Sequence, residues 1–180
     1  MTSELRVDKI VPTTGVPTGG GGGIIQTVST YDTDHIRSTS STSYVDIMEA
    51  TITPINSTSK ILVLVSLSIS KADSYSFLGR VLRNGSAIAG GDSAATNSTD
   101  KSNWEDGVWF NIRAFIYSPN THTHHYLDSP NSTSALTYKV QGKTSGGSGY
   151  EFAINVPRNE ENYLYGSPVY SNITLMEISA

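Results

Sequence analysis

Histidines alternate with threonines in Thr121-His122-Thr123-His124-His125, the segment whose residue types and spacing are best suited to bind a metal ion. In a β-strand, His122 and His124 would point to the same side, and neutral imidazoles can ligate a transition metal. Three chains around one axis would bring six such nitrogens together. The other interpretation is a polar strand in solvent, because the turn residues Ser118-Pro119-Asn120 come directly before it. We favour the polar strand and predict no metal and no cofactor, with His122 and His124 as the candidate ligands if a metal does bind.

Two glycine-containing motifs resemble catalytic signatures but lack what those signatures require. Gly142-Lys143-Thr144 ends like a phosphate-binding loop, yet position 137 is Thr where such a loop has Gly. Residues 142–146 have the spacing of a nucleophile elbow with Thr144 in place of serine, and that motif needs a following helix, which this sequence does not predict. We therefore interpret residues 142–149 as a glycine-rich hairpin loop.

Carboxylates are the remaining group that could support catalysis, since paired acids hydrolyse glycosidic bonds. The 16 acidic residues are scattered along the chain, which is ordinary for a soluble protein, and a small domain rarely forms the long cleft that polysaccharide cleavage needs. The sequence therefore predicts a protein that is not an enzyme and has no catalytic residues. The alternative is a polysaccharide depolymerase, with the candidate acids Asp92, Asp100, Glu105, Asp106 and Asp128.

Aromatic residues beside polar groups indicate a binding function. Trp104 and Asp106 lie in a long polar stretch, and Tyr163 and Tyr165 lie within residues 162–166, near a predicted loop. Aromatic rings stack on ligands while acids and amides orient them, so these four are the candidate receptor-binding residues. Alternatively, Trp104 only covers one end of the fold.

Alternating apolar and polar residues predict short β-strands along most of the chain, and no segment has the pattern of an amphipathic helix. Asn84-Gly85 between two apolar runs predicts a type I′ hairpin, and Trp109 is predicted to lie in the core or in an interface. Short strands separated by turn residues predict an all-β fold, an antiparallel β-sandwich or jelly roll. The predicted strands span residues 24–28, 44–54, 60–70, 77–83, 86–89, 108–117, 123–127, 134–141, 150–156, 162–165 and 173–178.

The strand at residues 60–70 has the clearest pattern. Its odd-numbered positions from 63 to 69 are apolar and would face one side, while Leu62 and Leu64 would face the other side. Apolar residues on both faces indicate either a central strand or a strand covered by a neighbouring subunit.

The first 23 residues predict a flexible attachment segment. Residues 5–11 alternate between apolar and charged side chains, which suits one extended strand, and residues 19–23 are consecutive glycines that act as a hinge. We divide the chain into an attachment segment with its hinge, residues 1–23, and a β-sandwich head, residues 24–180. The anchor residues of the extended strand are Leu5, Val7, Ile10 and Val11.

Charge and composition exclude several classes of partner. The net charge is -4 at pH 7 and the 12 Lys and Arg residues are scattered, so the basic patch of a nucleic-acid-binding protein is missing. The longest apolar stretch, residues 61–65, is too short to span a bilayer, and we predict no membrane insertion. The sequence has no cysteine, so the fold must hold by packing alone.

Three parts of the sequence resemble tail-fibre and related virion appendage proteins of tailed bacteriophages. Residues 3–12 resemble their N-terminal attachment segment, and residues 50–54 with 59–63, and residues 126–138, are similar to stretches that recur in their heads. The resemblance implies a homotrimer in the virion, with residues 1–18 docked in a tail, baseplate or capsid adaptor protein. It also implies a head that binds a glycan or protein of the host surface. The expected function is a non-enzymatic tail fibre; the alternative is a head fibre or capsid-decoration protein with a purely structural role.

Overall fold

The computed structural model describes residues 23–33, 37–38, 42–71, 76–89, 107–112, 119–145, 151–157 and 169–179. All regular structure in these residues is β-strand, and each strand pair is antiparallel. The strands are β1 (Ile24–Asp32), β2 (Arg37–Ser38), β3 (Val45–Ile52), β4 (Lys60–Lys71), β5 (Phe77–Arg83), β6 (Ser86–Ala87), β7 (Val108–Ile112), β8 (Asn120–Asp128), β9 (Leu136–Thr144), β10 (Phe152–Ile154) and β11 (Ser171–Ile178).

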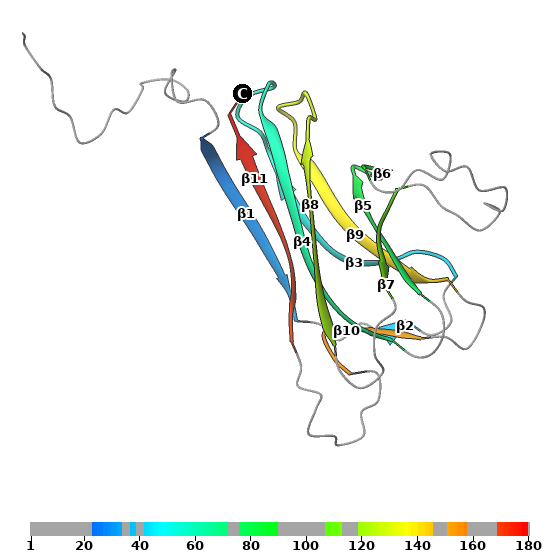
Figure 1. Ribbon diagram of the computed structural model, residues 1–180. Helices are drawn as coiled ribbons and strands as arrows, with labels where there is room; N and C mark the ends of the chain where they lie inside the picture. The colour runs from blue at the N-terminus through cyan, green and yellow to red at the C-terminus, as the bar shows by residue number, and fades with distance from the viewer. Residues whose placement is uncertain are drawn as a thin grey trace, which may run out of the picture.

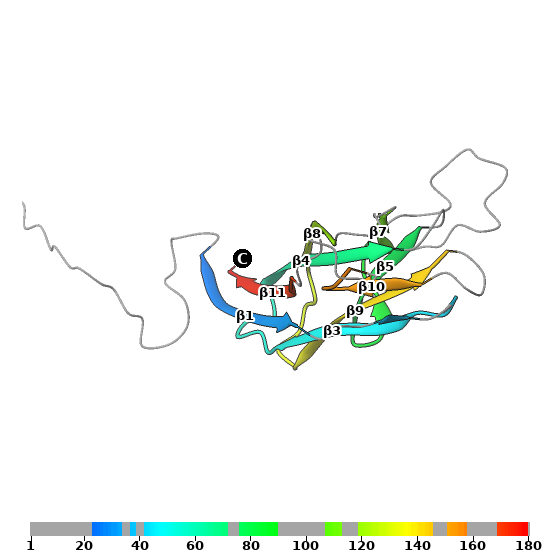
Figure 2. The same cartoon turned by 90° about the horizontal axis from the view of Figure 1, so that it is seen from below.

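The strands form two sheets that pack as layers (Figures 1 and 2). In sheet A the order is β1-β11-β4-β8, and β10 and β2 continue beside the last residues of β4. In sheet B the order is β3-β9-β5, with β7 and β6 along the other edge of β5. With the short strands β2, β6 and β10 set aside, the orders β1-β11-β4-β8 and β3-β9-β5-β7 are those of a jelly roll. The predicted all-β sandwich is confirmed.

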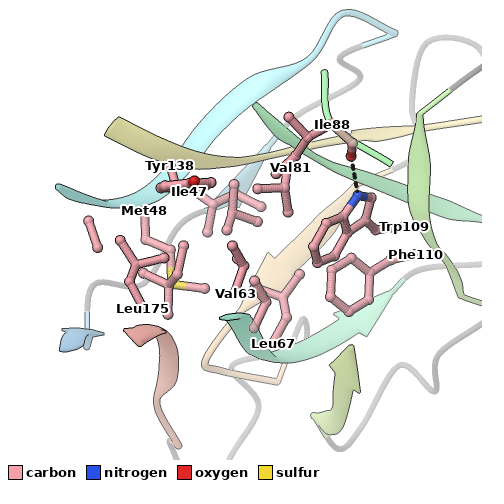
Figure 3. Packing of buried hydrophobic residues seen from close by; sticks show 14 of the residues in the cluster. Ile47, Met48, Val63, Leu67, Val81, Ile88, Trp109, Phe110, Tyr138 and Leu175 are labelled. Carbon is pink, nitrogen blue, oxygen red and sulfur yellow. Dashed lines mark hydrogen bonds between the residues drawn. The ribbon is translucent and has the colours of Figure 1, made fainter. Parts of the chain in front are cut away.

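The core lies between the sheets and is formed by residues of β3, β4, β5, β7, β9, β10 and β11, with Val28 of β1 packed against it. In β4, Val63, Val65, Leu67 and Ile69 are fully buried, as the alternation predicts, and each such side chain contributes about 2 kcal/mol to folding. Figure 3 shows part of this core, including Trp109, whose indole N–H donates to the Ile88 carbonyl oxygen at 2.7 Å. The prediction of Trp109 as a core residue is confirmed.

Two turn predictions have opposite outcomes. At the β5–β6 hairpin, Asn84 (φ 48°) and Gly85 (φ 86°) have the positive angles of a type I′ turn, so that prediction is confirmed. The predicted hairpin loop at residues 142–149 is wrong in its first part, because β9 continues to Thr144. Gly142 is a strand residue that lies under the ring of Phe77, and a Cβ there would overlap that ring. Its glycine is therefore required by packing and not by a turn.

The two outermost strands in sequence, β1 and β11, are neighbours in space. Ile24 pairs with Ile178 at one end of this ladder, and Asp32 pairs with Ser171 at the other. Gly23, the last residue of the predicted hinge, accepts a hydrogen bond from Ser179 N at 3.0 Å. We call the end of sheet A at Ile24 the tether end, and the opposite end the far end; Figure 1 shows the start of β1 beside the end of β11.

Candidate functional site

The outer face of sheet B is charged and internally paired. Lys139 Nζ lies 2.7 Å from Asp46 Oδ2 and 3.2 Å from Glu49 Oε2, and hydrogen bonds from Gln141 and Lys139 lower the pKa of Asp46. The guanidinium of Arg80 lies 3.9 Å from the centre of the Tyr44 ring. These groups satisfy one another in solvent, which is typical of a face that stays in water.

The outer face of sheet A has a different chemistry. Strand alternation and register place on it residues from β1, β11, β4 and β8, of which Lys60 is the only Lys, Arg, Asp or Glu among those described. Depletion of charge is the compositional mark of a contact surface. The set is Thr27, Ser29, Tyr31, Lys60, Leu62, Leu64, Ser66, Ser68, Thr121, Thr123, His125, Leu127, Asn172, Thr174, Met176 and Ile178.

The tether-end half of this face contains a row of apolar side chains. Leu62 pairs with Met176 on one side and with Leu127 on the other, so three apolar side chains form a row across the sheet. Leu127 is 43% exposed and Ile24, at the same end, is 60% exposed. The strand pattern predicted β4 to be central or covered, and β4 is indeed central, yet the outer faces of its leucines remain partly exposed.

The far-end half of the face carries an exposed tyrosine pair beside a shallow pocket. Tyr31 and Tyr170 are 63% and 56% exposed, and their rings meet edge to face with centres 5.6 Å apart. The pocket has a volume of about 360 Å³, and its described lining residues carry no charge. They are Ser66, Thr121, Val169, Tyr170 and Asn172.

A buried polar network holds this end of the face in place. The backbone N–H of Val169 donates to the Asn155 carbonyl at 2.9 Å, and the Ser68 hydroxyl donates to the Tyr170 carbonyl at 3.2 Å. Asn155 is fully buried with φ 67°, and its side-chain oxygen accepts from the Ser171 hydroxyl at 2.7 Å. The segment that presents Tyr170 is thus fixed from below by residues of two strands, β4 and β11, and of the bend that follows β10.

The predicted histidine pair lies on β8, at the edge of sheet A, on the same face as Val65 and Leu67, with His122 half-buried and His124 exposed. His122 and His124 share one face, as predicted, and the His124 ring meets Phe110 edge to face with centres 4.7 Å apart. The Nε2 atom of His122 is enclosed without a hydrogen-bond partner among the described residues, and burial, with the nearby His124, lowers the His122 pKa. In the described parts of the chain no group of three or more His, Cys, Asp or Glu is arranged to hold a metal ion.

Most of the other predicted site residues lie outside the described residues. This holds for the anchor residues Leu5, Val7, Ile10 and Val11, for the receptor candidates Trp104, Asp106, Tyr163 and Tyr165, and for four of the five candidate acids. The fifth acid, Asp128, is buried and paired with Arg83 and Tyr138. The structure therefore gives Asp128 a role in joining the two sheets.

Tyr31 and Tyr170 are binding candidates that sequence reasoning missed. Each follows a polar stretch and resembles any other tyrosine of a Ser/Thr-rich chain. The available signal was the alternation of residues 27–31, which extends the first predicted strand and places Tyr31 on its outer face. Nothing local indicated that Tyr170 would lie beside it.

Comparison with known proteins does not assign the chain to a family. No protein-family model matches it, and no curated protein matches it. A solved structure of the infectious bursal disease virus Gx strain is similar with a TM-score of 0.38 and 12% identity, over 93% of this chain and 44% of that chain. The chain thus spans less than half the length of that structure, and similarity at this level assigns no function. Among the described residues, no helix is long and apolar enough to cross a membrane.

Proposed function

We propose that this chain is a virion structural protein, a homotrimeric tail appendage of a tailed bacteriophage that binds the host surface without catalysis. Residues 1–18 dock in another virion protein, and the jelly-roll head is displayed beyond the glycine hinge. The observation that carries the proposal is the outer face of sheet A, on which β1, β11, β4 and β8 place one charged residue, while the outer face of sheet B carries the ion pairs of Lys139 with Asp46 and Glu49.

The tether-end half of that face supports association with other copies. The row of Leu62, Met176 and Leu127, extended by Ile24 and Ile178, is partly to fully exposed. Water contacts such a surface unfavourably, and a neighbouring chain would cover it. Because Lys60 is the only Lys, Arg, Asp or Glu that the described residues of β1, β11, β4 and β8 place on this face, like copies can approach with little repulsion. Three copies would convert weak single contacts with a host into strong attachment.

The position of the tyrosine pair suits display. Strand β1 leads from Gly23 to Tyr31 near the far end, so the tyrosines lie at the end of the sheet opposite the one at which an anchored chain would be held. About 20 Å of strand separates Leu62 from Ser68, which lets the apolar half contact neighbouring copies while the far-end pocket stays open.

Deletion of residues 1–18 tests the anchor. We expect the shortened chain to keep its β-structure, because the sandwich begins at Ile24, and to be missing from purified particles. Far-ultraviolet circular dichroism checks the fold, and immunoblotting of particles checks incorporation. Incorporation at the normal level would show that the attachment surface lies elsewhere.

A capsid-decoration protein or head fibre is the second candidate, because such a protein would need an anchor and an uncharged contact face just as a tail appendage would. The far-end pocket separates the two functions, because a decoration protein with a purely structural role needs no ligand. Labelling particles with antibody fragments and viewing them by electron microscopy distinguishes them: label at the tail supports the appendage, and label over the capsid supports decoration.

A further inference from the structure

We infer that the far-end pocket of sheet A, lined by Ser66, Thr121, Tyr170 and Asn172, is a binding site for one uncharged sugar ring of a glycan. This deepens the proposed function and rests on it only for the source of the glycan, the host surface. The pocket and its described lining residues belong to one chain, so the sugar site itself does not depend on the proposed function.

The tyrosine rings supply the apolar surface that a sugar requires. Tyr170 is 56% exposed and borders the pocket, so one ring face is available for the C–H groups of a pyranose. Tyr31 meets that ring edge to face with centres 5.6 Å apart and limits its rotation. A rigid aromatic platform binds with little loss of conformational freedom.

The polar lining supplies groups that both donate and accept. Ser66 and Thr123 hydroxyls lie 3.3 Å apart, with either able to donate. The Thr121 hydroxyl lies 2.7 Å from that of Ser68, which accepts from it while donating its own proton to the Tyr170 carbonyl. Asn172 adds an amide, which donates from its nitrogen and accepts at its oxygen. Hydroxyls and an amide can pair with the hydroxyl groups of a sugar, since those groups also both donate and accept.

The absence of charge among the described lining residues determines the class of sugar. A carboxylate or phosphate leaves water at a high cost unless a cation or several N–H groups replace its hydration. None of the described lining residues is Lys, Arg or His. The lining therefore favours neutral hexoses and N-acetylhexosamines over sialic acids, uronic acids and phosphorylated sugars.

The pocket is preorganised, which separates it from an accidental hollow. Ser68, buried beneath the tyrosine, donates to the Tyr170 carbonyl and exchanges a hydrogen bond with Thr121. Asn155 receives the Val169 N–H and, through Ser171, is linked to the Ser68 backbone. A buried polar network of this kind fixes one arrangement of the groups above it. The volume of the pocket, about 360 Å³, is at the lower end of the range for ligand pockets. It fits one sugar ring while the rest of the glycan stays in solvent.

The test uses the full chain on an array of neutral and acidic glycans, followed by titration of the best neutral glycan. We expect neutral glycans to be retained and acidic ones not. Tyr170→Ala should weaken binding by at least about tenfold, while Tyr170→Phe, which keeps the ring, should bind normally. Tyr44→Ala is the matched control, because it removes a tyrosine from the outer face of sheet B and should change nothing.

Ser68→Ala tests the support beneath the pocket. It leaves every ring in place and removes the hydroxyl that bonds Thr121 and the Tyr170 carbonyl, so binding should fall several-fold without loss of β-structure. Circular dichroism of each variant checks that the sandwich is intact.

Three results would overturn the inference: retention of acidic glycans only, retention of no glycan, or binding that Tyr170→Ala leaves unchanged. A chain that is present at the phage tail and binds host envelopes, yet retains no glycan, would keep the proposed function and point to a protein receptor. A chain that binds neutral glycans but is located on the capsid would support the sugar-binding site and contradict the proposed function as a tail appendage.

Discussion

The carboxylate of Asp128 joins the two sheets by hydrogen bonds. It lies on β8 and is 5% exposed, and its carboxylate accepts from Arg83 Nη1 at 2.8 and 2.6 Å. The hydroxyl of Tyr138, a fully buried residue, donates to the same carboxylate at 2.7 Å. Burial, with this hydrogen bond, raises the pKa of Tyr138, which keeps the phenol protonated as a donor.

Asp128→Asn tests this junction. It preserves the shape of the side chain and removes the charge, so the partly buried Arg83 loses its counter-ion and the free energy of unfolding should fall by about 2 kcal/mol. Asp46→Asn is the control, because Asp46 is exposed and its ion pair with Lys139 should be worth less than about 1 kcal/mol. Urea unfolding measures both; equal losses would contradict a special role for Asp128.

At the scale of elements, Glu177 connects β11 to the turn between β3 and β4. It is fully buried and accepts from Gln26 Nε2 at 2.6 Å and from the backbone N–H groups of Ile55 and Asn56 at 2.9 and 3.2 Å. Burial alone would raise the pKa of Glu177, but these hydrogen bonds outweigh it and hold the pKa below the usual 4.5.

The lowered pKa predicts an acid-sensitive contribution to stability. A carboxyl whose pKa is lower in the folded chain stabilises the fold fully above its unfolded value near 4.5, and this contribution is lost as the pH falls through the folded value. Glu177→Gln should therefore lower the free energy of unfolding at pH 7 by about 1–2 kcal/mol and flatten its pH dependence below pH 5. Urea unfolding between pH 3 and 7 measures this, and an unchanged slope in the variant would contradict the assignment.

How far the sequence predicts these elements depends on the range of the interactions. The alternation of residues 61–69 and the Asn84-Gly85 turn are local, so β4 and the β5–β6 hairpin follow from the sequence directly. The local sequence predicts Gly142 as a loop residue, because the ring of Phe77 that requires a glycine there lies in another strand. The sequence does not predict the contact between Tyr31 and Tyr170 either, because only the pairing of β1 with β11 makes these distant residues neighbours.

For the whole molecule, the unequal outer faces predict association of like chains. The native mass should be about three times the 19.3 kDa of one chain, because the apolar row on sheet A is left partly exposed by the described residues. Leu62→Glu places a charge in that row and should yield monomers of 19.3 kDa with intact β-structure. Thr51→Glu, on the outer face of sheet B, is the control and should remain trimeric. Light scattering after size-exclusion chromatography distinguishes these states. If the unaltered chain is a monomer, the proposed trimer is wrong.

The antiparallel pairing of β1 with β11 also determines how the head would respond to force. A pull between Gly23 and a ligand held near Tyr31 runs along β1, from one end of the strand to the other. The ladder bonds that join β1 to β11 lie perpendicular to this direction, so the load shears them together and cannot peel them apart one by one. The head is therefore mechanically strongest along the line that connects its tether to its pocket.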